Sequence, residues 1–569
     1  MSAPVSPDRE KWSSRLGFIL AAAGSAIGLG SIWRFPYITG ENGGGAFVLV
    51  YLLCVMAVGI PVMICEIAMG RHTQRNPLGC FRRLTPPASL LAHAVGTGLL
   101  LTAVALLCFS AWGWAATALC LGALVFWQSW RVVGLMGILA GFLILSYYSV
   151  IGGWAIAYMG KAAKAGLSFE TVVEAQVAFK GFKENVGLVV FCHFLFMLLC
   201  TGIVYSGVQR GIERACTLMV PLLFIIMAIL ILRAVTLPGA RAGVSFCFTP
   251  SFKELTGRSV LIALGHAFFT LSLGMGAMIT YGSYLGRQDN IFAASVWITV
   301  LDTLVSVLAC LMIFPAVFAM GFAPGEGPGL VFQVVPAVFH RLPAGILWGT
   351  LFFLLLSVAA LASGISLLEV VTAYLVDERG WVRKRAALAT GAVTFAMGCL
   401  TAVSLDDWKA LPALEQLLVT GFGSARSSFF DMIDNLTCNW MLPLGGLFIC
   451  LFVGWVWGTR HAVDEIRQGA GSFGDVHLFT LMAGLQEDSA HNAGTHPLTL
   501  ASLWGVFVRF VCPVAILVTF LHAIGLIQVP PQAHDAVDDP PAARSAPHPA
   551  SLPPSVVPQE TSPQEPATR

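Results

Sequence analysis

The sequence predicts an all-α polytopic membrane protein, and three observations lead to that prediction. The 569-residue chain is 57% hydrophobic and only 11% charged, with a mean hydropathy of +0.80, whereas soluble domains are about 25% charged. Apolar runs of membrane-spanning length recur along the chain, and two of these runs are interrupted near their middle by glycines. We therefore expect a bundle of membrane-crossing helices, two of which are broken.

Eleven apolar runs reach the roughly 20 residues that a helix needs to cross a bilayer. A further apolar block at 88–127 is split by an aromatic turn and has arginines at both flanks, so we expect an extra hydrophobic hairpin at 88–130. The eleven runs cover residues 14–38, 45–70, 132–160, 186–206, 212–236, 257–285, 291–320, 345–376, 386–404, 436–458 and 501–527.

Basic residues concentrate in alternate loops, for example at Arg71, Arg210 and Arg383. Because cytoplasmic loops carry an excess of Lys and Arg, the N-terminus is predicted to be cytoplasmic and the C-terminus to be outside. The last segment is rich in Pro, Ala and Ser and is predicted to be disordered. The predicted segments are 1–15 (cytoplasmic), 16–87 (spans 1 and 2 with a loop), 88–130 (hairpin), 131–458 (spans 3 to 10), 459–500 (cytoplasmic loop), 501–527 (span 11) and 528–569 (tail).

The composition argues against several other classes of protein. A net charge of +2 without a clustered basic face does not fit a nucleic-acid-binding surface. The 14 cysteines are scattered through apolar segments without a CxxC pattern, so they are predicted to be small buried hydrophobes rather than a disulfide framework or a metal site. HExxH, a cluster of carboxylates and a nucleophile elbow are all missing from the sequence, and we do not expect an enzyme.

The two interrupted runs, 16–36 and 265–284, point to a function. Peptide groups in hydrocarbon must be satisfied internally, so a spanning helix tolerates an unwound middle only where it faces protein, water or a ligand. Paired broken spans indicate a transporter built from inverted repeats, with substrate and ions at the breaks. For either run alone, the glycines could instead serve only to let neighbouring helices pack closely. The presence of two such runs in corresponding positions favours a transporter. The glycines of the breaks are Gly24, Gly28 and Gly30 in the first run and Gly274 and Gly276 in the second.

An unwound segment offers free carbonyls to a small cation, and the positive end of the following half-helix attracts an anionic group. A sodium ion fits the free carbonyls, and the anionic group of a zwitterion fits the positive helix end. Hydroxyl side chains near the breaks support this interpretation. Each of them also has a purely structural alternative, because Ser and Thr often hydrogen-bond to the backbone of their own helix and a buried Tyr often needs only one carbonyl partner. These side chains are Tyr148, Thr270, Ser272 and Ser363.

Asp302 lies inside an apolar span that contains no Lys or Arg. A carboxylate at the centre of a span costs about 2.5 to 3.5 kcal/mol, so it needs a partner. A bound cation would serve, with Ser306 on the same helix face; a protonated Asp302 bonded to a neighbouring helix is the alternative. Two further intramembrane acids, Glu66 and Glu369, are expected to bond backbone groups that the breaks leave free.

Three segments resemble the neurotransmitter:sodium symporter family, in particular its bacterial amino-acid transporters. They are GFILAAAGSAIGLGSIWRFPYITGENGGGAF, FFTLSLGMGAMITYGSY and LILSYYSVIGGW. The resemblance covers residues 9 to 527 apart from 88–127, and it implies a leucine-transporter-like fold with inverted five-helix repeats and broken helices 1 and 6. It also implies a bacterial inner membrane as the location.

The resemblance also implies a set of site residues. The substrate carboxylate would meet the amides near Leu29 and Gly30 with the Tyr148 hydroxyl, and the amine would meet the carbonyls of Ala26, Phe269 and Thr270 with the Ser272 hydroxyl. The side-chain pocket would be lined by Ile144, Phe269, Met275, Ser363 and Leu367. The first sodium would take Ala26, Ser31, Thr270 and Asp302, and the second Gly24, Ile27, Ala359 and Ser363. The outer gate would be Arg34 with Asp434, and the inner gate Arg9 with Asp377.

Two residues depart from the family pattern. Ser31 stands where an Asn side chain usually binds the first sodium, and Ala362 stands where a Thr or Ser hydroxyl usually binds the second. We therefore expect a weak second sodium site. The predicted function is sodium-coupled symport of a neutral, hydrophobic amino acid across the lipid bilayer by alternating access. The alternatives are a proton-coupled or uncoupled carrier on the same fold, and a membrane receptor that does not transport.

Overall fold

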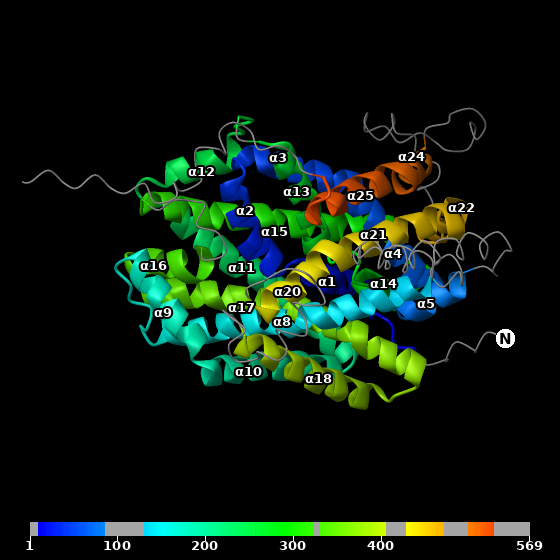
Figure 1. Ribbon diagram of the computed structural model, residues 1–569, viewed down its shortest axis with the longest axis horizontal. Helices are drawn as coiled ribbons and strands as arrows, with labels where there is room; N and C mark the ends of the chain where they lie inside the picture. The colour runs from blue at the N-terminus through cyan, green and yellow to red at the C-terminus, as the bar shows by residue number, and fades with distance from the viewer. Residues whose placement is uncertain are drawn as a thin grey trace, which may run out of the picture. The chain divides into compact units, whose positions relative to one another are not determined.

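The computed structural model describes residues 9–85, 130–253, 255–321, 330–404, 428–470 and 499–527, and these residues form a bundle of helices (Figure 1). The predicted hairpin at 88–130, the tail at 528–569 and most of the loop at 459–500 lie outside the described residues, apart from Trp130 and the ends of that loop. The all-α prediction is confirmed for the part of the chain that is described.

The helices follow in chain order, with η marking a π-helical turn. The first group is α1 (Arg15–Ala26), η1 (Gly30–Arg34), α2 (Phe35–Glu41), α3 (Gly45–Cys54), η2 (Val55–Gly59), α4 (Ile60–Thr73), α5 (Pro77–Leu84), α8 (Arg131–Ala163), α9 (Val172–Glu184), α10 (Val186–Tyr205), η3 (Val208–Glu213) and α11 (Arg214–Val235). The middle group is α12 (Ala240–Phe248), α13 (Gly257–Thr270), α14 (Ala277–Gly282), α15 (Ile291–Ala319), η5 (Leu330–Val334), α16 (Val335–His340), α17 (Gly345–Arg379) and α18 (Arg383–Val403). The last group is α20 (Phe429–Asp434), η6 (Asn435–Met441), α21 (Leu442–Leu451), η7 (Phe452–Gly458), α22 (Thr459–Arg467), α24 (Leu500–Val506), η9 (Phe507–Val511) and α25 (Cys512–Ala523).

Within the described residues, nine helices are long and apolar enough to cross a membrane, and a tenth span is a bent pair. The pair is α1 with the helix that runs from Gly30 to Glu41, and its two parts meet at 52°. The predicted run at 257–285 consists of α13 and α14, neither of which is long enough alone. Both predicted breaks are therefore present, whereas the total of eleven spans stays a prediction.

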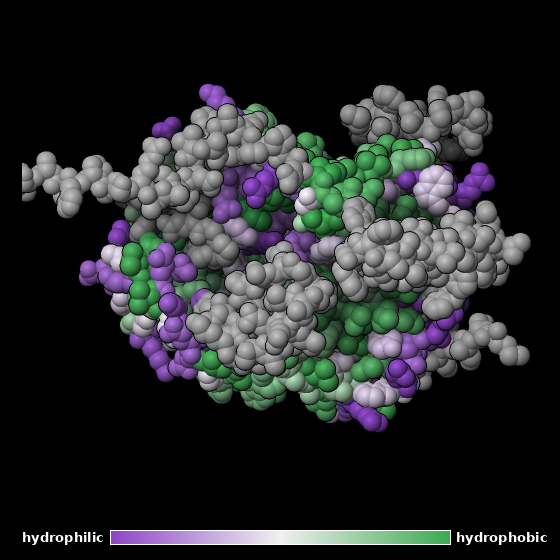
Figure 2. All heavy atoms as spheres, viewed as in Figure 1, coloured by the Kyte–Doolittle hydropathy of each residue, from purple (hydrophilic) through white to green (hydrophobic). Residues whose placement is uncertain are grey.

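The lipid-facing surface follows from the same composition. The outer face of α10 exposes large apolar side chains, with Phe191 56% and Leu198 55% exposed. Figure 2 shows hydrophobic residues over α10 and α18, with hydrophilic residues gathered mainly near the left and right edges of the view. A soluble protein would bury such side chains, so this face is suited to lipid.

The second break depends on left-handed backbone. Ser272, Gly274 and Gly276 have φ values of 54°, 79° and 75°, a region that strongly favours glycine. A Cβ at Gly274 would lie 2.4 Å from the carbonyl oxygen of Leu442, so no side chain fits there. The Gly274 amide donates to Oε1 of Glu66 at 2.7 Å, as expected for a backbone group freed by the break.

Glu369 does not bond backbone groups at either break, so the expectation for this residue is wrong. Its carboxylate accepts from the Tyr284 hydroxyl at 2.6 Å and from the Arg383 guanidinium at 2.6 and 3.0 Å. An arginine from the start of α18 reaches Glu369 on α17, and the buried charge is neutralised by this pair rather than by backbone amides.

A second charged cluster joins α4 to α22. Arg71 is buried, and its guanidinium donates to the Glu465 carboxylate at 2.7 Å and to the backbone carbonyls of Glu465 and Asp289. The His72 ring lies 2.8 Å from the other oxygen of Glu465. Because Arg71 meets a carboxylate and two carbonyls, its buried charge is compensated, and α22 is held at the end of α4.

The close approach of α4 to α14 gives a stability prediction. A Cβ at Gly70 would lie 2.1 Å from the carbonyl oxygen of Ile279, whereas a Cβ at Gly160 on α8 would meet nothing within 4 Å. We expect Gly70→Ala to destabilise the protein by about 1 to 3 kcal/mol through overpacking. Gly160→Ala, the matched control, should be neutral or slightly stabilising, because alanine favours helix. Thermal unfolding of the purified proteins in detergent measures both, and equal midpoints would contradict the packing argument.

Candidate functional site

A small cavity of about 20 Å³ lies where the two breaks meet α8 and α17. Every residue predicted to hold the substrate lines it except Leu29, and Ser25 and Gly28 line it in addition. The lining residues are Ser25, Ala26, Gly28, Gly30, Ile144, Tyr148, Phe269, Thr270, Ser272, Met275, Ser363 and Leu367. Both breaks thus open on one space between four helices.

One side of the cavity presents hydrogen-bond donors. The Leu29 amide donates to the Tyr148 hydroxyl at 3.1 Å, so the tyrosine of α8 meets the backbone released at the first break. A Cβ at Gly28 would lie 2.4 Å from Oγ of Ser363 and 2.7 Å from the Tyr148 hydroxyl. Glycine is therefore the residue that lets this backbone approach both hydroxyls, and donors so placed suit an anionic group.

Serine hydroxyls link the two breaks to each other and to α17. The Ser272 hydroxyl donates to the Ser25 carbonyl at 3.0 Å, and the Ser25 hydroxyl donates to the Ser366 hydroxyl at 2.7 Å. Sequence reasoning missed Ser25 and Ser366, and the one available signal for Ser25 was a small hydroxyl beside Gly24. Apolar side chains complete the cavity, and the ring of Phe269 would lie 3.0 Å from a Cβ at Gly30.

The residues predicted for the first sodium lie together beside this cavity. The Ser31 hydroxyl donates to Oδ1 of Asp302 at 2.6 Å and lies 3.5 Å from the Ala26 carbonyl oxygen. The Tyr51 hydroxyl lies 3.0 Å from Oγ1 of Thr270 and donates to Oδ2 of Asp302 at 3.5 Å. Tyr51, a buried residue of α3, was missed because nothing in its own segment marks it.

Asp302 is fully buried, and no Lys or Arg of the described chain pairs with it. One carboxylate among neutral hydroxyl and carbonyl oxygens is the kind of oxygen-only set that hard cations prefer. Within the described part of the chain, no three His, Cys, Asp or Glu side chains gather as they would around a transition metal. The chemistry of this cluster therefore fits an alkali cation.

The residues predicted for the second sodium meet on the other side of α1. The Ser363 hydroxyl lies 3.3 Å from the carbonyl oxygens of both Gly24 and Ile27. Ala359 and Ala362 are buried on the same helix. The methyl group of Ala362 lies 3.4 Å from the position of a Cβ on Gly24, so a hydrocarbon group occupies the place from which a hydroxyl would reach the break.

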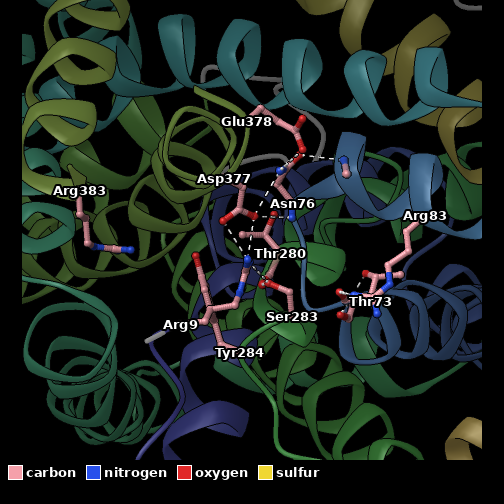
Figure 3. Close-up of polar contacts among 12 residues, drawn as sticks. Arg9, Thr73, Asn76, Arg83, Thr280, Ser283, Tyr284, Asp377, Glu378 and Arg383 are labelled. Carbon is pink, nitrogen blue, oxygen red and sulfur yellow. Dashed lines mark hydrogen bonds and ion pairs between the residues drawn. The ribbon is translucent and has the colours of Figure 1, made fainter. Parts of the chain in front are cut away.

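The predicted inner pair is in contact, as Figure 3 shows. Arg9 donates to both oxygens of Asp377 at 2.8 Å and to the Ser283 hydroxyl at 2.7 Å. The Asn76 amide donates to the same carboxylate at 2.7 Å. This cluster ties the N-terminal segment to α17 and to the end of α14.

The predicted outer pair is not in contact. Among the described ion pairs none joins Arg34 to Asp434. The Arg34 guanidinium instead lies 5.2 Å from the ring centre of Phe269, and Asp434 accepts from the Cys438 thiol at 3.3 Å. The structure thus brings together one of the two predicted pairs, the one that includes Arg9 of the N-terminal segment.

The chain matches known proteins over most of its length. The sequence model of the sodium:neurotransmitter symporter family matches residues 9–120 and 172–483. An uncharacterized sodium-dependent transporter of Bacillus subtilis is 35% identical over 91% of this chain and 98% of its own, and one of Haemophilus influenzae is 32% identical over 90% and 98%.

The crystal structure of MhsT in complex with L-phenylalanine is similar with a TM-score of 0.69 and 38% sequence identity, covering 91% of this chain and 100% of that chain. The family-model match includes part of 88–127, the segment treated above as an extra hairpin. The fold, the two breaks and these matches agree, and the relatives are transporters rather than enzymes. The chain belongs to the sodium:neurotransmitter symporter family.

Proposed function

We propose that the protein is a symporter that couples sodium entry to the uptake of a neutral, hydrophobic amino acid by alternating access. The observation that carries the proposal is the cavity at the two breaks, which is lined by backbone and hydroxyl groups of the broken helices together with apolar side chains. A zwitterion with an apolar side chain matches this combination of polar and apolar groups. That MhsT was crystallised with L-phenylalanine supports the same substrate class.

In this proposal the substrate carboxylate takes the amides near Leu29 and Gly30 and the Tyr148 hydroxyl. The amine takes the Ser272 hydroxyl and the carbonyls of Ala26, Phe269 and Thr270. Isolated carboxylate and ammonium groups are costly to bury, and these partners offset that cost. The pocket residues Ile144, Met275 and Leu367 then meet the side chain, and their apolar character disfavours charged amino acids.

Coupling to sodium follows from shared residues. Ala26 and Thr270 belong both to the predicted substrate set and to the first sodium set, so ordering the break for one ligand prepares it for the other. The Asp302 carboxylate supplies the negative charge that the cation requires. Each sodium that moves inward releases about 2.3 kcal/mol per 100 mV of membrane potential, in addition to its concentration gradient.

The direction of access is set by the two gates in this proposal. The Arg9–Asp377 pair closes the inner face, while no ion pair among the described residues joins Arg34 to Asp434. Closing the outer pair and opening the inner pair would carry the ligands across. A proton-coupled carrier is the second candidate, because Ala362 removes a hydroxyl from the second cation set.

The test of the proposal is a screen of single amino acids against the purified protein, with sodium or with choline as the cation. A ligand at a hundred times its dissociation constant stabilises by about 2.7 kcal/mol. We expect hydrophobic amino acids such as phenylalanine and leucine to raise the unfolding temperature only with sodium, and lysine and aspartate to have no effect. Equal stabilisation in choline would favour proton coupling, and binding without uptake into proteoliposomes would indicate a receptor.

Removing the Tyr148 hydroxyl should weaken substrate binding. Tyr148→Phe leaves the buried carboxylate short of one donor, which costs about 1.5 to 3 kcal/mol, so affinity should fall more than ten-fold. Tyr147→Phe is the matched control, because the Tyr147 hydroxyl bonds Cys438 and lies outside the cavity lining. Equilibrium binding of labelled substrate measures both variants. Unchanged affinity in Tyr148→Phe would place the carboxylate elsewhere.

Restoring an oxygen at position 362 should strengthen sodium binding. The second cation set contains carbonyls and one hydroxyl, so we expect the parent protein to have a low apparent sodium affinity and a stoichiometry nearer one than two. Ala362→Thr adds a ligand beside Gly24 and should lower the sodium concentration for half-maximal uptake. Ala362→Val has nearly the same volume without the oxygen and should not. A high-affinity, steep sodium curve in the parent that neither variant moves would exclude this role.

A further inference from the structure

A second and larger hollow of about 510 Å³ lies between α22 and the continuous helix formed by α24, η9 and α25. It shares no residue with the central cavity. Among the described residues, three arginines line it, Arg460 and Arg467 from α22 and Arg509 from η9, together with one carboxylate, Asp464. The charge of the groove therefore favours an anion.

Arg509 is the unusual member of this set. It lies nine residues beyond Leu500, about 14 Å along a helix whose length and hydropathy fit a membrane span. Its Nε donates to the Gly454 carbonyl at 2.9 Å, and its guanidinium lies 5.6 Å from the ring centre of Trp455. Among the described residues no carboxylate pairs with it. A charge at this depth is costly without a counter-ion.

The arginine is held in a defined position. Its Cγ would lie 3.2 Å from a Cβ at Gly454, so the aliphatic stem lies flat against η7 because residue 454 is a glycine. The stem can cover apolar surface while the guanidinium reaches toward the polar edge of the membrane. Arg509 lines the same groove as Arg460 and Arg467.

The groove lies at the end of the bundle that holds the N-terminal residues. Glu465 of α22 pairs with Arg71 at the end of α4, and the neighbouring Gln74 donates to the Leu285 carbonyl just beyond α14. Trp12 donates to the Tyr281 carbonyl of α14 itself. The loop charges predict this end to be cytoplasmic, where anionic lipids give the leaflet a negative surface potential.

Large apolar side chains flank the arginines. Val506 and Phe510 line the groove and are 50% and 53% exposed, and Trp455 is 58% exposed. Figure 2 shows largely hydrophobic surface over α24 and α25, with hydrophilic residues beside it toward α22. A free inorganic anion would use only the arginines, whereas a phospholipid would place its phosphate on them and its chains along the apolar side chains.

We propose that this groove binds the headgroup of an anionic phospholipid, with the phosphate held by Arg460, Arg467 and Arg509. Asp464 lies in the same groove and disfavours a headgroup that carries several negative charges close together. The lipid supplies the counter-ion that Arg509 lacks, and it fastens α22 to the span that follows. The site is independent of the transport proposal, because none of its residues meets the cavity or the gates.

The test compares lipid binding in the full-length protein and two triple variants. Arg460→Gln with Arg467→Gln and Arg509→Gln removes the site, while Arg210→Gln with Arg214→Gln and Arg379→Gln removes the same charge from exposed positions elsewhere. Detergent-solubilised protein is titrated with phosphatidylglycerol, phosphatidylcholine or inorganic phosphate, and the unfolding temperature and retained lipid are measured, the latter by native mass spectrometry. One arginine near the surface contributes about five-fold in affinity.

We expect phosphatidylglycerol to stabilise the parent and the control triple variant more than phosphatidylcholine does, with phosphate having no effect. The groove triple variant should lose this preference, and the exposed single variant Arg460→Gln should weaken phosphatidylglycerol binding about five-fold while folding normally. Equal stabilisation by both lipids, equal binding by the two triple variants, or stabilisation by phosphate alone would each overturn the proposal.

Discussion

The structure depends on one constraint: two membrane-spanning helices are unwound in the interior of the bundle, and each released peptide group needs a partner. The Tyr148 hydroxyl accepts from the Leu29 amide at the first break, and Glu66 accepts from the Gly274 amide at the second. An unsatisfied peptide group would cost several kcal/mol in this environment. Neighbouring helices therefore supply polar side chains at these levels, and the carbonyls and amides that remain are available to ligands.

The same constraint brings several polar groups and one carboxylate close together beside the first break. Asp302 stands beside the first break with hydroxyls from three different helices around it, namely those of Ser31, Tyr51 and Thr270. Hydroxyls stabilise a carboxylate but do not neutralise it, so the cluster retains a demand for positive charge. In contrast, the buried carboxylates of Glu369 and Glu465 already have arginine partners. These two acids are thus compensated by arginine, Glu66 accepts from a backbone amide at the second break, and Asp302 has only neutral hydroxyl partners among the described residues.

The N-terminal segment connects these features to the inner face. Arg9 binds Asp377, Trp12 binds the Tyr281 carbonyl, and the Ser13 amide and hydroxyl donate to Glu213 at 2.8 and 2.6 Å. A Cβ at Gly17 would collide with the Glu213 carboxylate, so a glycine at the start of α1 allows this contact. Because these bonds join the segment to three separate helices, its release would loosen the inner face at several points at once.

The sequence by itself determined the class of the fold and the two breaks, since hydropathy and glycine placement are local properties of the chain. Its resemblance to a known family also placed most residues that line the cavity. Other contacts join residues far apart in sequence, and only the tertiary structure decided them. Tyr51 completes the Asp302 cluster, Ser25 bonds Ser366, and Glu369 takes Arg383 rather than backbone amides.

The groove around Arg509 is also a feature that only the tertiary structure decided. A lone arginine in an apolar run is visible in the sequence, but its neighbours come from α22, a helix separated from it by a long loop. Likewise, the family resemblance implied the pairs Arg9 with Asp377 and Arg34 with Asp434, and the structure joins the first but not the second. Residue type and period decide which segments cross the membrane, whereas the packing of whole helices decides which charges meet, because that distance depends on every contact between them.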